Sequence, residues 1–252
     1  MDGSLESRVT EPAKGETSAV RKVSGSSHPP CVVCEARQLG MCSAVDAEIL
    51  PRLNVIATGR SVAAGRMLFE EGDPADHVFT ITAGMIKLYK LMSDGRRQIM
   101  GFLVPGDFLG LAFGRTYVYN AEAIVATTAC RFRRPHFLAL LDECPTLEKD
   151  ILTRTATELA AAQEQMLLLG RKTARERVAS FLLALARRRG TDPGRPLELA
   201  MSRADIADYL GLTIETVSRT LGRLSKDRLI ELVDAHTVVL RRLAALEQVA
   251  GS

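Results

Sequence analysis

Tryptophan is absent from this chain of 252 residues, and aromatic residues make up only 5% of it. No apolar run approaches the roughly 18 residues that a membrane-spanning helix needs, so no membrane-embedded protein is expected. The N-terminus also lacks the apolar stretch of a secretory signal. A cytoplasmic protein is therefore expected, in a compartment where thiols stay reduced.

The sequence also lacks the motifs of common enzyme classes. It contains no H-E-x-x-H, no G-x-S-x-G, and no G-x-G-x-x-G that opens a helix after a strand. Only four histidines are present. These absences predict that the protein is not an enzyme.

Cysteine is scarce and unevenly distributed. Three of the five cysteines, Cys31, Cys34 and Cys42, lie within CVVCEARQLGMC, and the other two are Cys130 and Cys144. An odd number argues against a fully paired disulfide framework, and close thiols in a reducing compartment more often bind metal. Thiolates are soft ligands that favour iron–sulfur clusters or zinc. Three neighbouring thiols and one distant thiol suit a cluster held by four cysteines.

Two other interpretations of the cysteines stay open. One is a structural zinc site completed by His28, although structural zinc modules more often show two paired C-x2-C knuckles and only one is present here. The other is a thiol/disulfide switch without any metal.

Composition divides the chain into five segments. Residues 1–27 are polar and lack aromatic residues, so they are expected to be a disordered tail. The cysteine-rich segment is 28–46, and it is followed at 47–142 by short apolar runs separated by glycine-containing turns. Such runs predict a β jelly roll or barrel, and no helix is apparent between the expected strands. A long helix at 143–170 and a compact helical domain at 171–252 complete an α+β protein.

The long helix carries a heptad pattern. Its seam residues are spaced 4, 3, 4 and 3 apart: Leu152, Ala156, Leu159, Gln163 and Met166. Such a seam predicts either a helix that packs on the barrel or one that pairs with a second copy of itself. A homodimer is favoured, because the opposite face, with Glu148, Thr155 and Glu158, stays polar.

The stretch MSRADIADYLGLTIETVSRTL predicts two helices around a tight turn. Ser202 and Thr213 are placed as N-caps, and Gly211 ends the first helix. Ile214, Val217, Leu221 and Leu224 are expected to form the apolar face of the second helix, and LIELVDAHTVVL a hairpin wing.

Three polar residues are expected on the outward face of the second helix. Glu215, Ser218 and Arg219 follow i, i+3, i+4 spacing, and arginine, glutamate and serine can each read base edges in a major groove. From Arg171 onward the chain has 15 Lys and Arg against 10 Asp and Glu. The alternative is an ordinary helical pair with a surface Glu–Arg contact, but caps, turn and polar trio together favour double-stranded DNA binding.

Barrel, seam helix and winged helix-turn-helix, in this order, resemble the catabolite activator protein and FNR superfamily of bacterial regulators. The strongest matches are AGMIKLYKLMSDGRRQIMGFLVPGDFLGL in the barrel and RADIADYLGLTIETVSRTLGRL, whose E-x-x-S-R pattern is similar to that of the FNR branch. The resemblance implies an oxygen-responsive transcription regulator and activator. It also implies a homodimer that binds a palindrome similar to TTGAT-N4-ATCAA, with one half-site per subunit.

The resemblance also implies a cofactor. FNR-type proteins hold a [4Fe-4S] cluster by three N-terminal cysteines and one from the barrel, and Cys31, Cys34, Cys42 and Cys130 match these positions. Cys144 is an additional thiol that could compete as fourth ligand.

The resemblance implies RNA polymerase as a partner, through the turn at 93–96. Cyclic AMP is not expected, because Asn120 and Ala121 occupy the positions of the phosphate-binding Arg-Ser pair and Leu111 that of the ribose-binding Glu.

Overall fold

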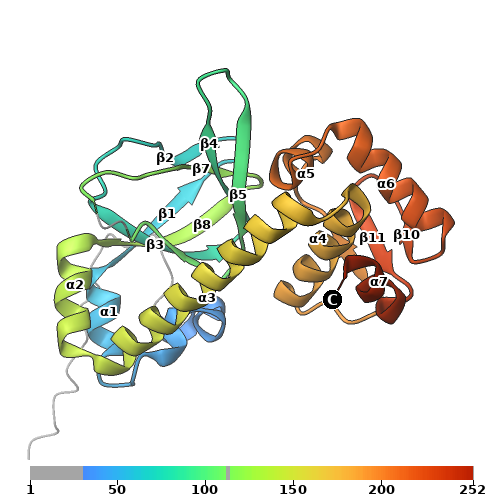
Figure 1. The fold of residues 1–252 in the computed structure, drawn as a ribbon. Helices are drawn as coiled ribbons and strands as arrows, with labels where there is room; N and C mark the ends of the chain where they lie inside the picture. The colour runs from blue at the N-terminus through green and yellow to red at the C-terminus, as the bar shows by residue number, and fades with distance from the viewer. Residues whose placement is uncertain (1–30, 112–113, 252) are drawn as a thin grey trace, which may run out of the picture.

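The computed structural model describes residues 31–111 and 114–251 and has an α+β fold. Figure 1 shows a β domain and a smaller helical domain joined by the long helix α3 (Pro145–Arg171). None of the helices in the described part of the chain combines the length and apolar character that a bilayer crossing requires.

Two antiparallel four-stranded sheets form the β domain, in the orders β1-β8-β3-β6 and β2-β7-β4-β5. Their strands are β1 (Ala57–Val62), β2 (Met67–Phe69), β3 (His77–Ala83), β4 (Ile86–Leu91), β5 (Arg97–Leu103), β6 (Phe108–Leu109), β7 (Asn120–Ala123) and β8 (Thr127–Arg133). Gly84 and Gly106 turn the chain with φ angles of 89° and 96°, which favour glycine. The predicted jelly-roll class is thus confirmed.

Aromatic rings fill part of the space between the two sheets. Phe69 stacks on Tyr117 with ring centroids 3.7 Å apart, and Phe79 and Tyr119 lie against Phe69 at 5.8 Å each. All four belong to, or pack against, the apolar cluster between the sheets. The interior of this domain is therefore a packed core.

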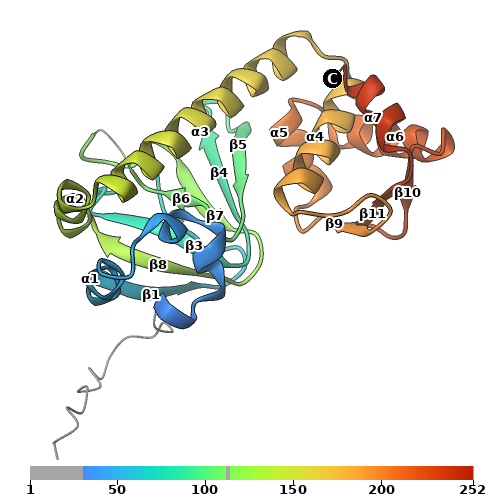
Figure 2. The same ribbon diagram turned by 90° about the horizontal axis from the view of Figure 1, so that it is seen from below.

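The cysteine segment forms three short 3-10 helices on the outside of the first sheet. They are η1 (Cys31–Val33), η2 (Glu35–Leu39) and η3 (Met41–Ala44). Contacts run from η2 to β3, from η3 to α3 and from η1 to the helix α1 (Leu50–Ile56). Figure 2 shows this blue segment lying beside the first sheet and α3. Side chains of η1 and η3, among them Cys31 and Met41, join a second apolar cluster that includes Phe132 and Leu147.

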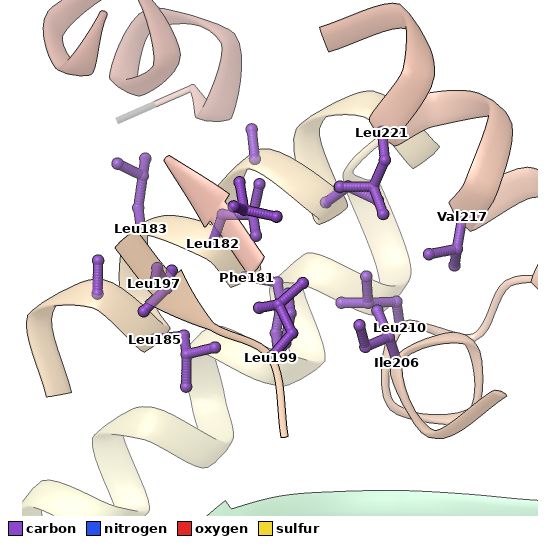
Figure 3. Packing of buried hydrophobic residues seen from close by; sticks show 14 of the residues in the cluster. Phe181, Leu182, Leu183, Leu185, Leu197, Leu199, Ile206, Leu210, Val217 and Leu221 are labelled. Carbon is purple, nitrogen blue, oxygen red and sulfur yellow. The ribbon is translucent and has the colours of Figure 1, made fainter. Parts of the chain in front are cut away.

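The helical domain contains α4 (Ala174–Arg188), α5 (Arg203–Leu210), α6 (Ile214–Lys226) and α7 (Leu243–Ala250). A three-stranded sheet completes it in the order β10-β11-β9, with β9 (Pro196–Glu198), β10 (Ile230–Leu232) and β11 (Thr237–Leu240). Figure 3 shows leucines of α4 meeting Leu197, Ile206, Val217 and Leu221 in one core. The predicted hairpin wing is confirmed by the pairing of β10 with β11.

The structure departs from the sequence analysis in three elements. Helices α1 and α2 (Arg134–Glu143) flank the strands within 47–142, where only strands and turns were expected. Strand β9 adds a third strand to the wing. The prediction that Ile214 belongs to the apolar face is wrong, because this first residue of α6 is 48% exposed while Val217, Leu221 and Leu224 are buried. Ile214 is the first residue of α6, and the end of a helix is less constrained by the helix period than its centre.

Candidate DNA interface and cysteine site

The two helices of the turn are fixed by their caps. Ser202 and Asp205 form a reciprocal capping box at the start of α5, and Gly211 ends the helix in the left-handed conformation at φ 61°. Thr213 accepts a hydrogen bond from the Thr216 backbone N–H at 3.2 Å and so caps α6. These contacts are the ones that the sequence predicts, and they define where α5 begins and ends and where α6 begins.

The polar trio lies on the outside of α6. Glu215, Ser218 and Arg219 are all exposed, whereas Val217 on the opposite side is fully buried. Hydrogen bonds to its own backbone N–H and to Thr213 hold the pKa of Glu215 below its ordinary value, and the charge of Arg219 adds to this effect. At neutral pH the trio therefore presents an acceptor, a hydroxyl and a cation, which are groups that read base edges.

The sheet and the cysteine segment place four thiols within electrostatic range of one another. Cys130 is the central residue of β8, opposite Gly59 of β1 and Thr80 of β3, and it is only 7% exposed. Cys31 and Cys42 belong to the same apolar cluster as Cys130. Cys34 is half-buried and lines a pocket of about 310 Å³ together with Cys130.

Electrostatics show that these thiols influence one another. Burial, together with the nearby thiols of Cys34, Cys42 and Cys31, raises the pKa of Cys130 to about 12. Burial likewise raises the pKa of Cys42 to about 12, with contributions from Cys31 and Cys34. Buried thiolates repel one another, so Cys130 and Cys42 keep their protons at neutral pH. A cationic metal bound between the thiols would stabilise the thiolates and displace the protons.

The four thiols suit an iron–sulfur cluster better than a single metal ion. Within residues 31–111 and 114–251, no group of three or more His, Cys, Asp and Glu side chains is arranged to hold one metal ion. A cubane cluster instead receives its four thiolates at four separate iron atoms. All-thiolate donors, mutual proximity and the adjoining pocket fit such a cluster. His28, the proposed zinc ligand, lies outside the described residues.

Cys144 is not among the thiols that act on the pKa of Cys130. It separates α2 from α3, and its Sγ is 3.4 Å from the Oγ1 of Thr146. It is buried in the same large apolar cluster as Cys130. The charges that raise the pKa of Cys130 come from the other three cysteines.

Two cations near the thiols were missed by the sequence analysis. Arg37 of η2 lowers the pKa of Cys31 and Cys42, and Arg154 of α3 lowers that of Cys42, each against larger opposing effects. Both would offset the negative charge of a tetrathiolate cluster. Arg154 is 112 positions from Cys42, and no local pattern in the sequence connects them.

The five seam residues of α3 share an exposed face. Leu152, Leu159 and Met166 are 69%, 60% and 65% exposed, and Ala156 and Gln163 are exposed as well. Another side of the helix buries Leu147 and Ile151 against the β domain. The prediction that α3 is polar away from the seam is therefore wrong in its first two turns. The helix therefore packs on the barrel through one face and leaves the predicted seam uncovered in a single chain.

The positions aligned with a cyclic-nucleotide site are built for packing. Asn120 is buried, and its Oδ1 accepts a hydrogen bond from the Glu71 backbone N–H at 3.1 Å. Ala121 is fully buried, and Leu111 is 38% exposed. None of these three side chains carries the positive charge that a phosphodiester requires.

Two family descriptions match separate parts of the chain. Residues 59–144 match the Cyclic nucleotide-binding domain family, and residues 176–249 match the Crp-like helix-turn-helix domain family. Together with α3 these matches define a class of protein: DNA-binding regulators built from a β domain, a long helix and a helix-turn-helix domain.

Similar proteins of known sequence and structure show to which family of regulators the chain belongs. It is 42% identical to "Transcriptional activatory protein AadR" of Rhodopseudomonas palustris, over 82% of this chain and 87% of that protein. It is 39% identical to "Transcriptional activator protein FnrL" of Cereibacter sphaeroides, over 88% of this chain and 92% of that protein. The solved structure of FixK2 from Bradyrhizobium japonicum matches 78% of this chain and 98% of its own, with 40% identity and a TM-score of 0.74. The chain belongs to the CRP/FNR family of transcription regulators, and its relatives are regulators rather than enzymes.

Proposed function

We propose that this regulator activates transcription when oxygen is absent, and that it binds DNA as a homodimer when an oxygen-labile [4Fe-4S] cluster is intact. The observation that supports this proposal is that four thiols from segments far apart in the sequence lie within electrostatic range of one another. Three come from the cysteine segment and one from the centre of β8. A thiol/disulfide switch uses the same thiols and is the second candidate.

The ligands would be Cys31, Cys34, Cys42 and Cys130. When bound, a [4Fe-4S] cluster supplies an oxygen-labile cross-link between thiolates. Cys31, Cys34 and Cys42 would thereby tie the cysteine segment to Cys130 of β8, and η3 of that segment contacts α3. Loss of the tie would release the cysteine segment and weaken pairing of α3.

DNA recognition is assigned to the trio on α6. Family members dimerise, and two copies of α6 would read the half-sites of a palindrome similar to TTGAT-N4-ATCAA. The exposed turn at 93–96 between β4 and β5 would contact RNA polymerase, by analogy with the family. No cyclic nucleotide is expected to bind, because the phosphate would meet buried Asn120 and Ala121.

Replacing Arg219 with alanine is expected to weaken binding of the palindrome by about 1–3 kcal/mol and to relax preference for one base pair. The reason is the loss of a donor that can bridge two acceptors of guanine. Competition binding against single-base variants of the site measures both effects. Arg187→Ala removes a charge from α4 of the same domain, where Arg187 pairs with Glu247, and should leave base preference unchanged.

The coupling of the thiol site to dimerisation is tested by sedimentation. Protein purified without oxygen and loaded with iron and sulfide should sediment as a dimer. After exposure to air, the same sample should have a higher dimer dissociation constant, so it becomes monomeric at higher protein concentrations. Iron, sulfide and DNA affinity are measured on each fraction. A dimer that is equally tight in both samples would contradict this coupling.

A further inference from the structure

One turn of the β domain lies between the cysteine segment and the DNA-binding domain. It comprises residues 104–107, between β5 and β6, and we refer to it as the 104–107 turn. On one side, the backbone of Gly106 meets Leu39 and Gly40 so closely that a Cβ on Gly40 would stand 2.4 Å from the Gly106 carbonyl oxygen. A Cβ on Gly106 would stand 2.5 Å from the Leu39 carbonyl oxygen. Two glycines therefore permit a direct backbone contact.

On its other side, the 104–107 turn contacts α4. The carboxylate of Asp107 accepts a hydrogen bond from the Nη2 of Arg188 at 2.5 Å. The other terminal nitrogen of Arg188 donates to the Phe102 carbonyl oxygen at 3.0 Å. Arg188 is the last residue of α4, the helix that carries the core of the DNA-binding domain.

The turn between these contacts is firmly held. The same Asp107 carboxylate accepts from the Val104 backbone N–H at 2.7 Å. Gly106 donates to the Ile81 carbonyl oxygen, and Ile81 donates to the Asp107 carbonyl oxygen, each at 2.9 Å. These hydrogen bonds fix the position of Asp107 relative to Gly106, so a displacement at Gly106 would be expected to reach Asp107.

Electrostatics place the same elements together. Burial raises the pKa of Asp107, while Arg188, the Val104 N–H and Arg154 oppose that rise. Arg154 also lowers the pKa of Cys42. One arginine of α3 is thus within electrostatic range of both a proposed cluster ligand and the carboxylate that binds α4.

We propose that the 104–107 turn couples the cysteine segment to the DNA-binding domain of the same protomer, with Arg188 as a positioning residue. Seating of the segment on Gly106 would hold Asp107 where it orients α4, and hence α6. This route lies within one chain and acts in addition to pairing of α3. It rests on the proposed function, because it assumes that the state of the thiols changes how the segment sits.

A second contact between the domains supplies a matched control. Arg97 of β5 binds Asp205 and Asp208 of α5 at 2.9 and 2.7 Å, so it also fixes the DNA-binding domain to the β domain. Its partners lie on α5 and not on the 104–107 turn. Arg97→Gln and Arg188→Gln each remove one cation from an interface between domains, but only the second acts through the turn.

The first experiment measures affinity for the palindrome in two states, loaded without oxygen and stripped of iron. Protein concentrations are kept above the dimer dissociation constant, which sedimentation determines for each variant. In the wild type, the ratio of the two dissociation constants should be on the order of tenfold or more. Arg188→Gln should lower that ratio at least about threefold while dimerisation is unchanged, and Arg97→Gln should shift both affinities by the same factor.

The outcomes separate the two proposals. A wild-type ratio of one at these concentrations would overturn the coupling through the turn. It would overturn the oxygen-responsive function as well only if the dimer dissociation constants of the loaded and stripped proteins were also equal. A normal wild-type ratio that Arg188→Gln preserves would overturn only the coupling. An equal loss of ratio in Arg97→Gln would also overturn it, because any loosened domain contact would then have the same effect.

The second experiment needs no cluster. Gly40→Ala displaces the cysteine segment from Gly106, and hydrogen exchange followed by mass spectrometry reports where the chain loosens. Exchange should accelerate at the segment and also at the end of α4 around Arg188. Arg188→Gln should in turn accelerate exchange around Gly40, because coupling is reciprocal. Acceleration confined to the mutated side in both variants would contradict the proposal.

Discussion

Replacing Cys130 with serine is expected to abolish stable binding of iron and sulfide. Cys130 is the thiolate that would connect the barrel to the cysteine segment. It is 7% exposed and lies within electrostatic range of the other three thiols. A hydroxyl is a poor substitute for a soft thiolate ligand. Iron and acid-labile sulfide should fall from about four per chain to near zero in protein purified without oxygen, and DNA affinity should fall to that of the stripped wild type.

Cys144→Ser is the matched control for this result. Cys144 is an equally buried thiol, but its Sγ contacts Thr146 at the junction of α2 and α3. This variant should keep about four iron atoms and four sulfides per chain. If Cys144→Ser loses the cluster and Cys130→Ser retains it, the assignment of the fourth ligand is wrong.

Replacing Leu159 with glutamate is expected to dissociate the dimer. Leu159 lies at the centre of the exposed seam of α3 and is 60% exposed in a single chain. Pairing of the helices would bury two unpaired carboxylates, each at a cost of several kcal/mol, so the dissociation constant should rise at least about a hundredfold. Sedimentation equilibrium measures the loss, and binding to the full palindrome should weaken with it.

Thr157→Glu introduces the same charge elsewhere on α3. Thr157 is exposed and lies two positions from Leu159, on the other side of the helix, so this variant should remain a dimer and bind the palindrome normally. Dissociation of both variants to the same extent would indicate a general loss of helix stability. A dimer in Leu159→Glu would show that another surface makes the interface.

Local signals explain why the DNA-binding domain could be predicted closely. Caps and the left-handed Gly211 depend on residues three or four positions apart, and their hydrogen bonds are those expected. The helix period also separates the buried Val217 from the exposed Arg219. Only the first position of α6, Ile214, breaks this pattern, because a helix end is less constrained by period than its centre.

Contacts between distant segments could not be predicted in this way. Helix α2 begins directly after β8, and its apolar pattern is weak, so the sequence does not distinguish it from the strands of the barrel. Strand β9 is three residues long and gains its identity by pairing with β11. Gly40 contacts Gly106, and Asp107 contacts Arg188, across long stretches of chain. No periodic pattern in the sequence links the residues of either pair. The family resemblance nominated the four cysteines, while their spatial meeting required the fold.

The central claim is that the four thiols hold an oxygen-labile cluster that supports DNA binding. Its most direct test is to measure iron and acid-labile sulfide per chain after strictly anaerobic purification, and then to follow both, with DNA affinity, during exposure to air. We predict about four of each, lost in air together with DNA binding. Stoichiometric zinc, or DNA binding that is unchanged in air with no metal present, would contradict it.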